Sequence, residues 1–101
     1  MKTVYICGPM RGKPDLGRGA FRQAEARLRE LGYHVINPAV LPIDLPWRVY
    51  MPICLAMCRE ADMIAPLPGW TRSSGARLEM DYARQTGKKV FWFAETEEDG
   101  K

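Results

Sequence analysis

The 101-residue sequence has only three cysteines and one histidine, and none of the cysteines form a Cys-x-x-Cys pair. An odd number of cysteines without such a pair argues against a disulfide framework and a zinc cluster. We therefore expect neither a metal nor a cofactor. Cys54 and Cys58 stand four residues apart, which suits a metal pair, but no third ligand accompanies them, so small core residues are the better interpretation.

Long apolar runs are also missing, and none approaches the ~20 residues needed to span a bilayer. The first ten residues, MKTVYICGPM, are too short and too soon broken to serve as a signal peptide. These absences predict a cytoplasmic protein without a membrane partner. The net charge of +3 is mild and its cations are spread along the chain, so no nucleic-acid polymer is expected as a partner.

An apolar content of 47% is enough for one ordered domain with its own core. Apolar segments rich in β-branched and aromatic residues predict four strands, at residues 3–7, 33–37, 62–65 and 89–93. Helical periodicity predicts three helices between them, over about 15–31, 49–60 and 75–85. This alternation implies a parallel sheet, for which we expect the strand order 2-1-3-4. The predicted fold is a Rossmann-like or flavodoxin-like α/β three-layer sandwich with a small parallel sheet.

The segment 67–87, LPGWTRSSGARLEMDYARQTG, concentrates the unusual residues of the chain. A strand leads into it, a polar Ser/Gly turn follows, and Gly75 is expected to open a helix. Free backbone N–H groups and the helix dipole both face such a turn, which makes it a ready anion site.

Glu79 lies one helical turn after Gly75 on the same face. Because Gly75 has no side chain, we expect space above the carboxylate, and the helix dipole should keep Glu79 ionised. A charged carboxylate beside an anion site can serve as a nucleophile or a general base. The alternative is a surface glutamate on a solvated helix.

The loop after the first predicted strand is basic and flexible. Arg11 can fork onto a phosphate or carboxylate there, or it can be a solvated loop residue. Tyr5, within the strand, can orient a substrate or belong to the core. The loops after strands one and three should flank one crevice at the topological switch point of the sheet.

The Pro-rich segment 38–48 is long for a loop in so small a domain, and such loops often form the wall or lid of a site. Trp47, Tyr50 and Met51 follow it closely. They can cover an apolar ring of a ligand, fill the core or meet another subunit. We expect a homodimer or higher homo-oligomer that uses this apolar patch.

Two motifs resemble those of the nucleoside 2-deoxyribosyltransferase superfamily: YICGPMRG at residues 5–12 and SSGARLE at residues 73–79. The resemblance runs from Tyr5 to Phe93 and is close to the small bacterial and phage domains of unknown function in that superfamily. The chain is also similar to the 2′-deoxynucleoside 5′-monophosphate N-glycosidases. The resemblance to the superfamily implies a deoxyribosyltransferase-like domain over residues 1–94, followed by a polar tail over 95–101.

The resemblance also implies an activity: cleavage or transfer of the N-glycosidic bond of a 2′-deoxynucleoside or its 5′-monophosphate. Glu79 takes the place of the catalytic nucleophile, which forms a covalent deoxyribosyl ester, and Tyr5 is implied as a second catalytic residue. The remaining matches are substrate-binding positions: Gly8, Arg11, Trp70, Ser73, Ser74 and Gly75. Ser73 stands where the transferases have Asp, and a hydroxyl there favours a phosphorylated ligand, because a carboxylate would repel phosphate.

The sequence departs from the superfamily at one position. The superfamily usually has an Asp eight residues before the Asp that starts the third strand, and counting back from Asp62 gives Cys54. A neutral thiol is a poor replacement for a carboxylate that handles the proton of the leaving base. A catalytically silent nucleotide-binding module is therefore the alternative function, and an NAD-related glycosidase is a third option.

Overall fold

The structure is a computed structural model and describes residues 1–42 and 44–93. Four strands form one sheet: β1 (Thr3–Cys7), β2 (His34–Ile36), β3 (Met63–Pro66) and β4 (Lys89–Val90). They pair in the order β2-β1-β3-β4, and every pair is parallel. The predicted strand order 2-1-3-4 is thus confirmed.

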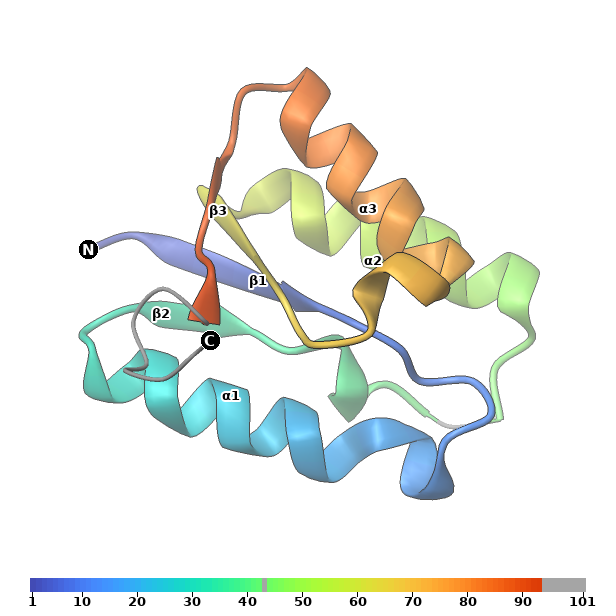
Figure 1. Cartoon of the computed structure of the whole chain (residues 1–101). Helices are drawn as coiled ribbons and strands as arrows, with labels where there is room; N and C mark the ends of the chain where they lie inside the picture. Colours follow the sequence, from blue (N-terminus) through green and yellow to red (C-terminus); the bar gives the residue numbers. More distant parts are fainter. Residues whose placement is uncertain (43, 94–101) are drawn as a thin grey trace.

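Three helices cover the two faces of this sheet. Helix α1 (Arg18–Glu30) packs on one face, and α2 (Trp47–Glu60) and α3 (Ser74–Gln85) pack on the other (Figure 1). The predicted α/β three-layer sandwich is therefore confirmed. None of the helices in the described ranges has both the length and the apolar character that crossing a membrane requires.

Strand β1 supplies the centre of both core layers. Val4 and Ile6 belong to the cluster that packs against α1, whereas Tyr5 and Cys7 belong to the cluster under α2 and α3. All four side chains are almost completely buried. Because successive strand residues face opposite sides of a sheet, this register directs the phenol of Tyr5 toward α3.

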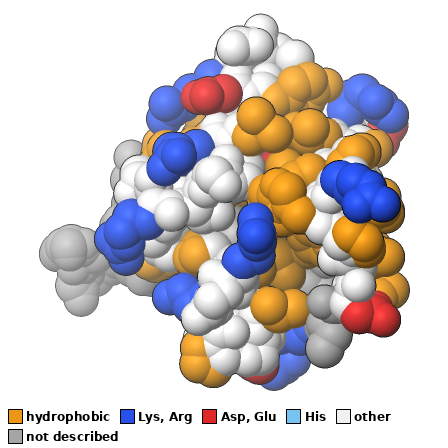
Figure 2. Space-filling view, turned by 90° about the vertical axis from the view of Figure 1, so that its right-hand side faces the viewer, with side chains coloured by type: hydrophobic (Ala, Val, Ile, Leu, Met, Phe, Trp, Pro, Cys, Tyr) orange, Lys and Arg blue, Asp and Glu red, His pale blue; other side chains and the backbone are white. Residues whose placement is uncertain are grey.

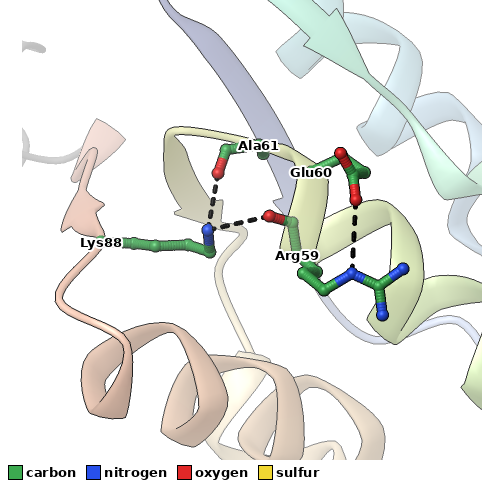
Figure 3. Close-up of polar contacts among 4 residues, drawn as sticks. All are labelled: Arg59, Glu60, Ala61 and Lys88. Atoms are coloured by element: carbon green, nitrogen blue, oxygen red, sulfur yellow. Dashed lines mark hydrogen bonds and ion pairs between the residues drawn. The ribbon is translucent and has the colours of Figure 1, made fainter.

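Polar contacts at the amino end of β3 hold the end of α2 (Figure 3). The ammonium of Lys88 donates to the backbone carbonyls of Ala61 at 2.7 Å and of Arg59 at 3.1 Å. Carbonyls in the last turn of a helix have no intrahelical donor, so Lys88 caps α2. The adjacent Arg59–Glu60 pair at 3.3 Å is exposed on both sides. This end of the sheet is accordingly structural, and the cavity lies at the opposite end.

Helix α1 starts later than predicted. The expected start at about residue 15 is three residues too early, because Asp15 and Leu16 have left-handed φ values of 50° and 54° and form part of a 3₁₀ turn. Gly17, with φ of 70°, precedes the first helical residue, Arg18. A glycine adopts that backbone conformation without a Cβ penalty, so the turn can redirect the chain into α1.

Strand β4 is shorter than the predicted segment 89–93, since it ends at Val90. One further backbone hydrogen bond to β3 follows, from the N–H of Phe91 to the carbonyl of Ile64 at 2.8 Å. Phe91 and Phe93 pack edge to face with ring centroids 5.1 Å apart. The predicted polar tail, 95–101, lies outside the described residues.

Candidate active site

A cavity of about 760 Å³ opens at the carboxyl ends of the strands. Figure 2 looks onto this side of the molecule, where apolar side chains gather and basic side chains surround them. The predicted site residues that line the cavity are Tyr5, Gly8, Arg11, Ser73, Ser74, Gly75 and Glu79. The loops after β1 and β3 therefore meet at one crevice, as the topological switch point requires.

Glu79 lies deep in this cavity and is only 5% exposed. The hydroxyl of Tyr5 donates a hydrogen bond of 2.8 Å to Oε2 of Glu79. Burial is the main cause that raises the pKa of Tyr5 well above its usual value, and the Glu79 carboxylate adds to it. Tyr5 is thus a permanent donor to Glu79, and the alternative of a solvated surface glutamate is wrong.

The charge state of Glu79 differs from the expectation. Burial raises its pKa to about 7, and the hydrogen bond from Tyr5 opposes this only in part. The predicted effect of the helix dipole is therefore outweighed by the removal of water from a carboxylate in the second turn of α3. Close to neutral pH the group is poised between its protonated and ionised forms, as a nucleophile or base in a cleft often is.

This pKa predicts how stability depends on pH. Between the unfolded pKa of 4.5 and the folded pKa of about 7, the folded state binds more protons at Glu79 than the unfolded state. The contribution of this group to the free energy of unfolding should thus fall as pH rises through that range, by about 3 kcal/mol in total. Denaturant titrations of wild type and Glu79→Gln from pH 4.5 to 8 measure this. The free energy of unfolding of Glu79→Gln minus that of the wild type should grow as pH rises. A difference that stays constant over this pH range would contradict the pKa assigned to Glu79.

Gly75 does not leave open space above Glu79, contrary to the sequence-based expectation. A Cβ built on Gly75 would lie 2.5 Å from Cη2 of Trp47 and 3.3 Å from the sulfur of Met51. The indole therefore occupies the room that the missing side chain provides. Gly75 lines the cavity, but its immediate role is to let Trp47 approach the backbone of α3.

The start of α3 has the properties of an anion site. The helix begins at Ser74, one residue earlier than predicted, because the hydroxyl oxygen of Ser73 accepts the N–H of Ala76 at 3.2 Å. Within the described part of the chain, the N–H groups of Ser74 and Gly75 have no backbone acceptor. The hydroxyl of Ser73 can still donate its own proton, since a hydroxyl combines one donor with two acceptor positions.

Three arginines line the cavity, namely Arg11, Arg18 and Arg72, whereas Glu79 is the only carboxylate among its described lining residues. The guanidinium of Arg11 lies over the ring of Trp47, 4.5 Å from its centroid. Arg18 donates from Nη2 to the carbonyl of Leu41 at 2.8 Å, and its buried Nε has no partner within the described residues. The excess of positive charge favours an anionic ligand.

Arg18 and Arg72 were not identified from the sequence. Arg72 lies within the polar loop before α3, so the composition of that loop could have indicated Arg72 as a site residue. The sequence gives no such signal for Arg18, because it looks like one of several cations on α1 until the turn at 14–17 places it beside Leu41.

Trp70 does not line the cavity, so the structure gives no support to its predicted role as a substrate-binding residue. Its ring packs against Trp92, with centroids 6.4 Å apart, and the guanidinium of Arg84 lies 5.8 Å from its centroid. The tryptophan at the cavity is Trp47 instead, and Tyr50 and Met51 accompany it in the lining. Of the three alternatives for these residues, lining a ligand site agrees with their position.

Cys54 lies beside Glu79 and Tyr5. It is 1% exposed and lines the cavity. Burial raises the pKa of its thiol to about 11, the charge of Glu79 adds to this, and the nearby hydroxyls of Tyr5 and Tyr50 act in the opposite direction. Cys54 is thus a neutral thiol, at the position where the resemblance to the superfamily implies an Asp. Cys7, Cys54 and Cys58 are all free and buried.

At the edge of the cavity, Gly8 occupies a position where a side chain would be too close to a neighbouring residue. A Cβ on Gly8 would lie 2.8 Å from Cβ of Leu67, which follows β3. The backbone N–H of Leu67 donates to the carbonyl of Cys7 at 2.8 Å. Gly8 therefore allows the ends of β1 and β3 to converge, and this convergence brings the two predicted loops to one site.

Comparison with known proteins agrees with this description. A solved structure described as 2-desoxiribosyltransferase from Leishmania mexicana superposes with a TM-score of 0.70 and 25% sequence identity. The match covers 92% of this chain and 64% of that one, so the chain spans less than two thirds of the length of this relative. It supports the resemblance to the nucleoside 2-deoxyribosyltransferase superfamily. None of the curated proteins matches the sequence significantly. Residues 2–92 match the family described as "Domain of unknown function (DUF4406)", and the chain belongs to that family.

Proposed function

We propose that this protein cleaves or transfers the N-glycosidic bond of a 2′-deoxynucleoside 5′-monophosphate, with Glu79 as nucleophile. An ionised oxygen of Glu79 attacks the anomeric carbon, and the carbon–nitrogen bond breaks with its electron pair moving to the base. The base takes up a proton from water as it leaves. Water or a second base then attacks the same carbon and releases Glu79, so the configuration at that carbon is retained.

The observation that carries this proposal is the hydrogen bond between Tyr5 and Glu79 inside the cavity. It fixes one carboxylate oxygen and leaves the other for attack. The nearly complete burial of Glu79 removes the water that would otherwise solvate and weaken a nucleophile. A glycosyl transfer function also agrees with the likeness to a deoxyribosyltransferase.

The preference for a 5′-phosphate rests on charge and on helix geometry. The cavity is lined by the start of α3 with its N–H groups, by Ser73 and Ser74 with their hydroxyls, and by Arg11. A helix N-terminus with unpaired N–H groups binds phosphate well. This part of the proposal assigns the chain to the monophosphate N-glycosidase branch of the superfamily.

Incubation with a panel of purine and pyrimidine deoxynucleoside 5′-monophosphates, followed by chromatography for free base, tests the reaction. A second free base added to the same mixtures separates hydrolysis from transfer, because a transferase then produces a new nucleotide. If no base appears from any member of the panel, the enzymatic proposal is wrong.

Arg11→Met should weaken binding of a deoxynucleoside 5′-monophosphate by about 1.5–3 kcal/mol, roughly ten- to a hundredfold in Kd, because a charge-assisted hydrogen bond is lost. Binding of the unphosphorylated nucleoside should change far less. Calorimetric titration of both ligands measures this. Arg59→Met is a matched control, since Arg59 is an exposed arginine at the far end of α2. Equal losses for both ligands would argue against a phosphate contact at Arg11.

A catalytically silent nucleotide-binding module is the second candidate, and the neutral thiol of Cys54 beside Glu79 favours it. A silent module would bind the nucleotides of the panel and release no base. The two candidates thus make the same prediction for Arg11→Met and opposite predictions for turnover.

A further inference from the structure

We propose that Trp47 is a positioning residue for phosphate recognition: its indole holds the Arg11 guanidinium at the mouth of the cavity, and the bare backbone of Gly75 seats the indole. The inference rests on the proposed 5′-phosphate function and deepens it.

Arg11 needs such support because it lies on an exposed loop. Within the described residues, no carboxylate pairs with Arg11 and no hydrogen bond holds its side chain. The next two residues in the sequence, Gly12 and Lys13, are exposed as well. A free arginine loses much rotamer entropy when it binds an anion. The contact of the guanidinium with the indole of Trp47, whose centroid lies 4.5 Å from Cζ of Arg11, removes part of that loss in advance.

Stacking suits a guanidinium that must also bind phosphate. The contact with an aromatic ring uses the flat face of the guanidinium, whereas its N–H donors point outward in the plane. Those donors therefore remain available to fork onto two phosphate oxygens. A salt bridge to a carboxylate would instead occupy the same donors.

The position of Trp47 is fixed from the other side. The edge of its six-membered ring lies against Gly75, where an added Cβ would be 2.5 Å from Cη2 and 3.2 Å from Cζ2. The ring also stacks with Tyr50 at a centroid distance of 6.4 Å. Trp47 thus spans the mouth from the loop after β1 to the start of α3. The Arg11 guanidinium and the start of α3 therefore both lie against the same indole.

Filling of the core does not account for this arrangement. Trp47 is 37% exposed, and it is the first residue of α2 rather than part of its buried face. The indole lines the cavity, and its ring contacts the two elements that are proposed to bind phosphate. A purely structural residue would affect the binding of phosphorylated and unphosphorylated ligands alike.

The test compares Kd for a deoxynucleoside and for its 5′-monophosphate, by calorimetry. In Trp47→Leu, the preference for the monophosphate should fall about tenfold, and Kd for the nucleoside should change less than threefold. Trp47→Phe keeps an aromatic face and should retain part of the preference. Thermal unfolding of each variant shows that it is folded. A preference that survives unchanged in Trp47→Leu would overturn the inference.

Gly75→Ala provides a second route to the same result. The new methyl group must displace the indole, so this variant should lose the phosphate preference although Arg11 and Trp47 are both present. In the Trp47→Leu background, Gly75→Ala should have little further effect, because the displaced ring is already absent. Fully additive effects of the two changes would overturn the inference.

The wild-type protein separates this inference from the function on which it rests. A wild type without any preference for the 5′-monophosphate would overturn the phosphate assignment and the role of Trp47 together. A wild-type preference that neither Trp47→Leu nor Gly75→Ala reduces would overturn the role of Trp47 alone.

Discussion

Glu79→Gln is expected to lower the rate of N-glycosidic bond cleavage by about 10⁴-fold or more, while Kd for the nucleotide changes little. The amide has the size of the carboxylate, and its carbonyl oxygen can still accept the hydrogen bond from Tyr5. It lacks the negative charge that attack on the anomeric carbon requires. Single-turnover release of base, together with calorimetric Kd values, separates the loss of chemistry from a loss of binding.

Glu30→Gln is the matched control for this substitution. Glu30 lies on α1, its side chain is 72% exposed, and its contact with Arg27 is a surface pair at 3.8 Å. The control should leave turnover unchanged. If Glu79→Gln retains wild-type turnover, Glu79 is not the nucleophile, and the silent binding module or another catalytic residue must be considered.

The pKa of Glu79 adds a check that the substitution alone does not give. Because only the ionised carboxylate attacks, kcat/KM for the wild type should rise with pH and level off above about 7. A rate that rises instead near 4.5 would show that Glu79 is not buried as described.

The fold was predictable because local signals and the global topology agree. Strand and helix patterns alternate along the chain, and the parallel order 2-1-3-4 follows from that alternation with right-handed crossovers. The same reasoning brings the loop containing Arg11 to the helix containing Glu79, since both follow the carboxyl ends of neighbouring strands β1 and β3. That these two residues line one cavity was therefore predictable, without any knowledge of side-chain packing.

The environment of Glu79 was not predictable in the same way. Spacing places Glu79 one turn after Gly75, but it does not show which side chain fills the room above that glycine. Trp47 is 28 residues earlier in the chain and reaches Gly75 only through the packing of α2 against α3. The same packing removes water from Glu79, so its raised pKa also depends on contacts that are distant in sequence.

Trp70 illustrates the converse limit. The resemblance to the superfamily implies that Trp70 is a substrate-binding residue. Its direction depends on the 3₁₀ turn Trp70–Arg72, which begins after Gly69 with a φ of 89° and directs the ring toward Trp92. Glycine adopts this backbone conformation without a Cβ penalty, so the direction of Trp70 depends on a turn geometry and not on the aromatic residue itself.

Cys54→Asp is expected to raise the rate of base release by about 10²-fold, within the range of 10²–10⁴ typical of general acid catalysis. Cys54 lies in the cavity next to Glu79 and Tyr5, and its own thiol, with a pKa of about 11, is a weak proton donor near neutral pH. A carboxyl group at this position meets the same burial and the same negative charge of Glu79. Both raise its pKa, so it should be protonated when Glu79 is ionised.

Cys54→Asn is the matched control, because an amide has the size and polarity of a carboxylic acid but cannot transfer a proton to the leaving base. The Asn variant should therefore keep the low rate. Both variants bury a polar group where the wild type has a thiol that is 1% exposed, so each should also unfold at a lower temperature. Thermal unfolding and nucleotide Kd values are measured on both, so that loss of fold is not mistaken for loss of chemistry.

The pH profile of the Cys54→Asp variant decides between a general acid and a merely electrostatic effect. A general acid next to an ionised nucleophile gives a bell-shaped dependence of kcat/KM, since one carboxyl group must be charged and the other protonated. The wild type lacks the second group and should show only the rising limb due to Glu79. A Cys54→Asp variant that folds, binds nucleotide and is no faster than Cys54→Asn would show that a carboxyl group at this position is not what the site lacks.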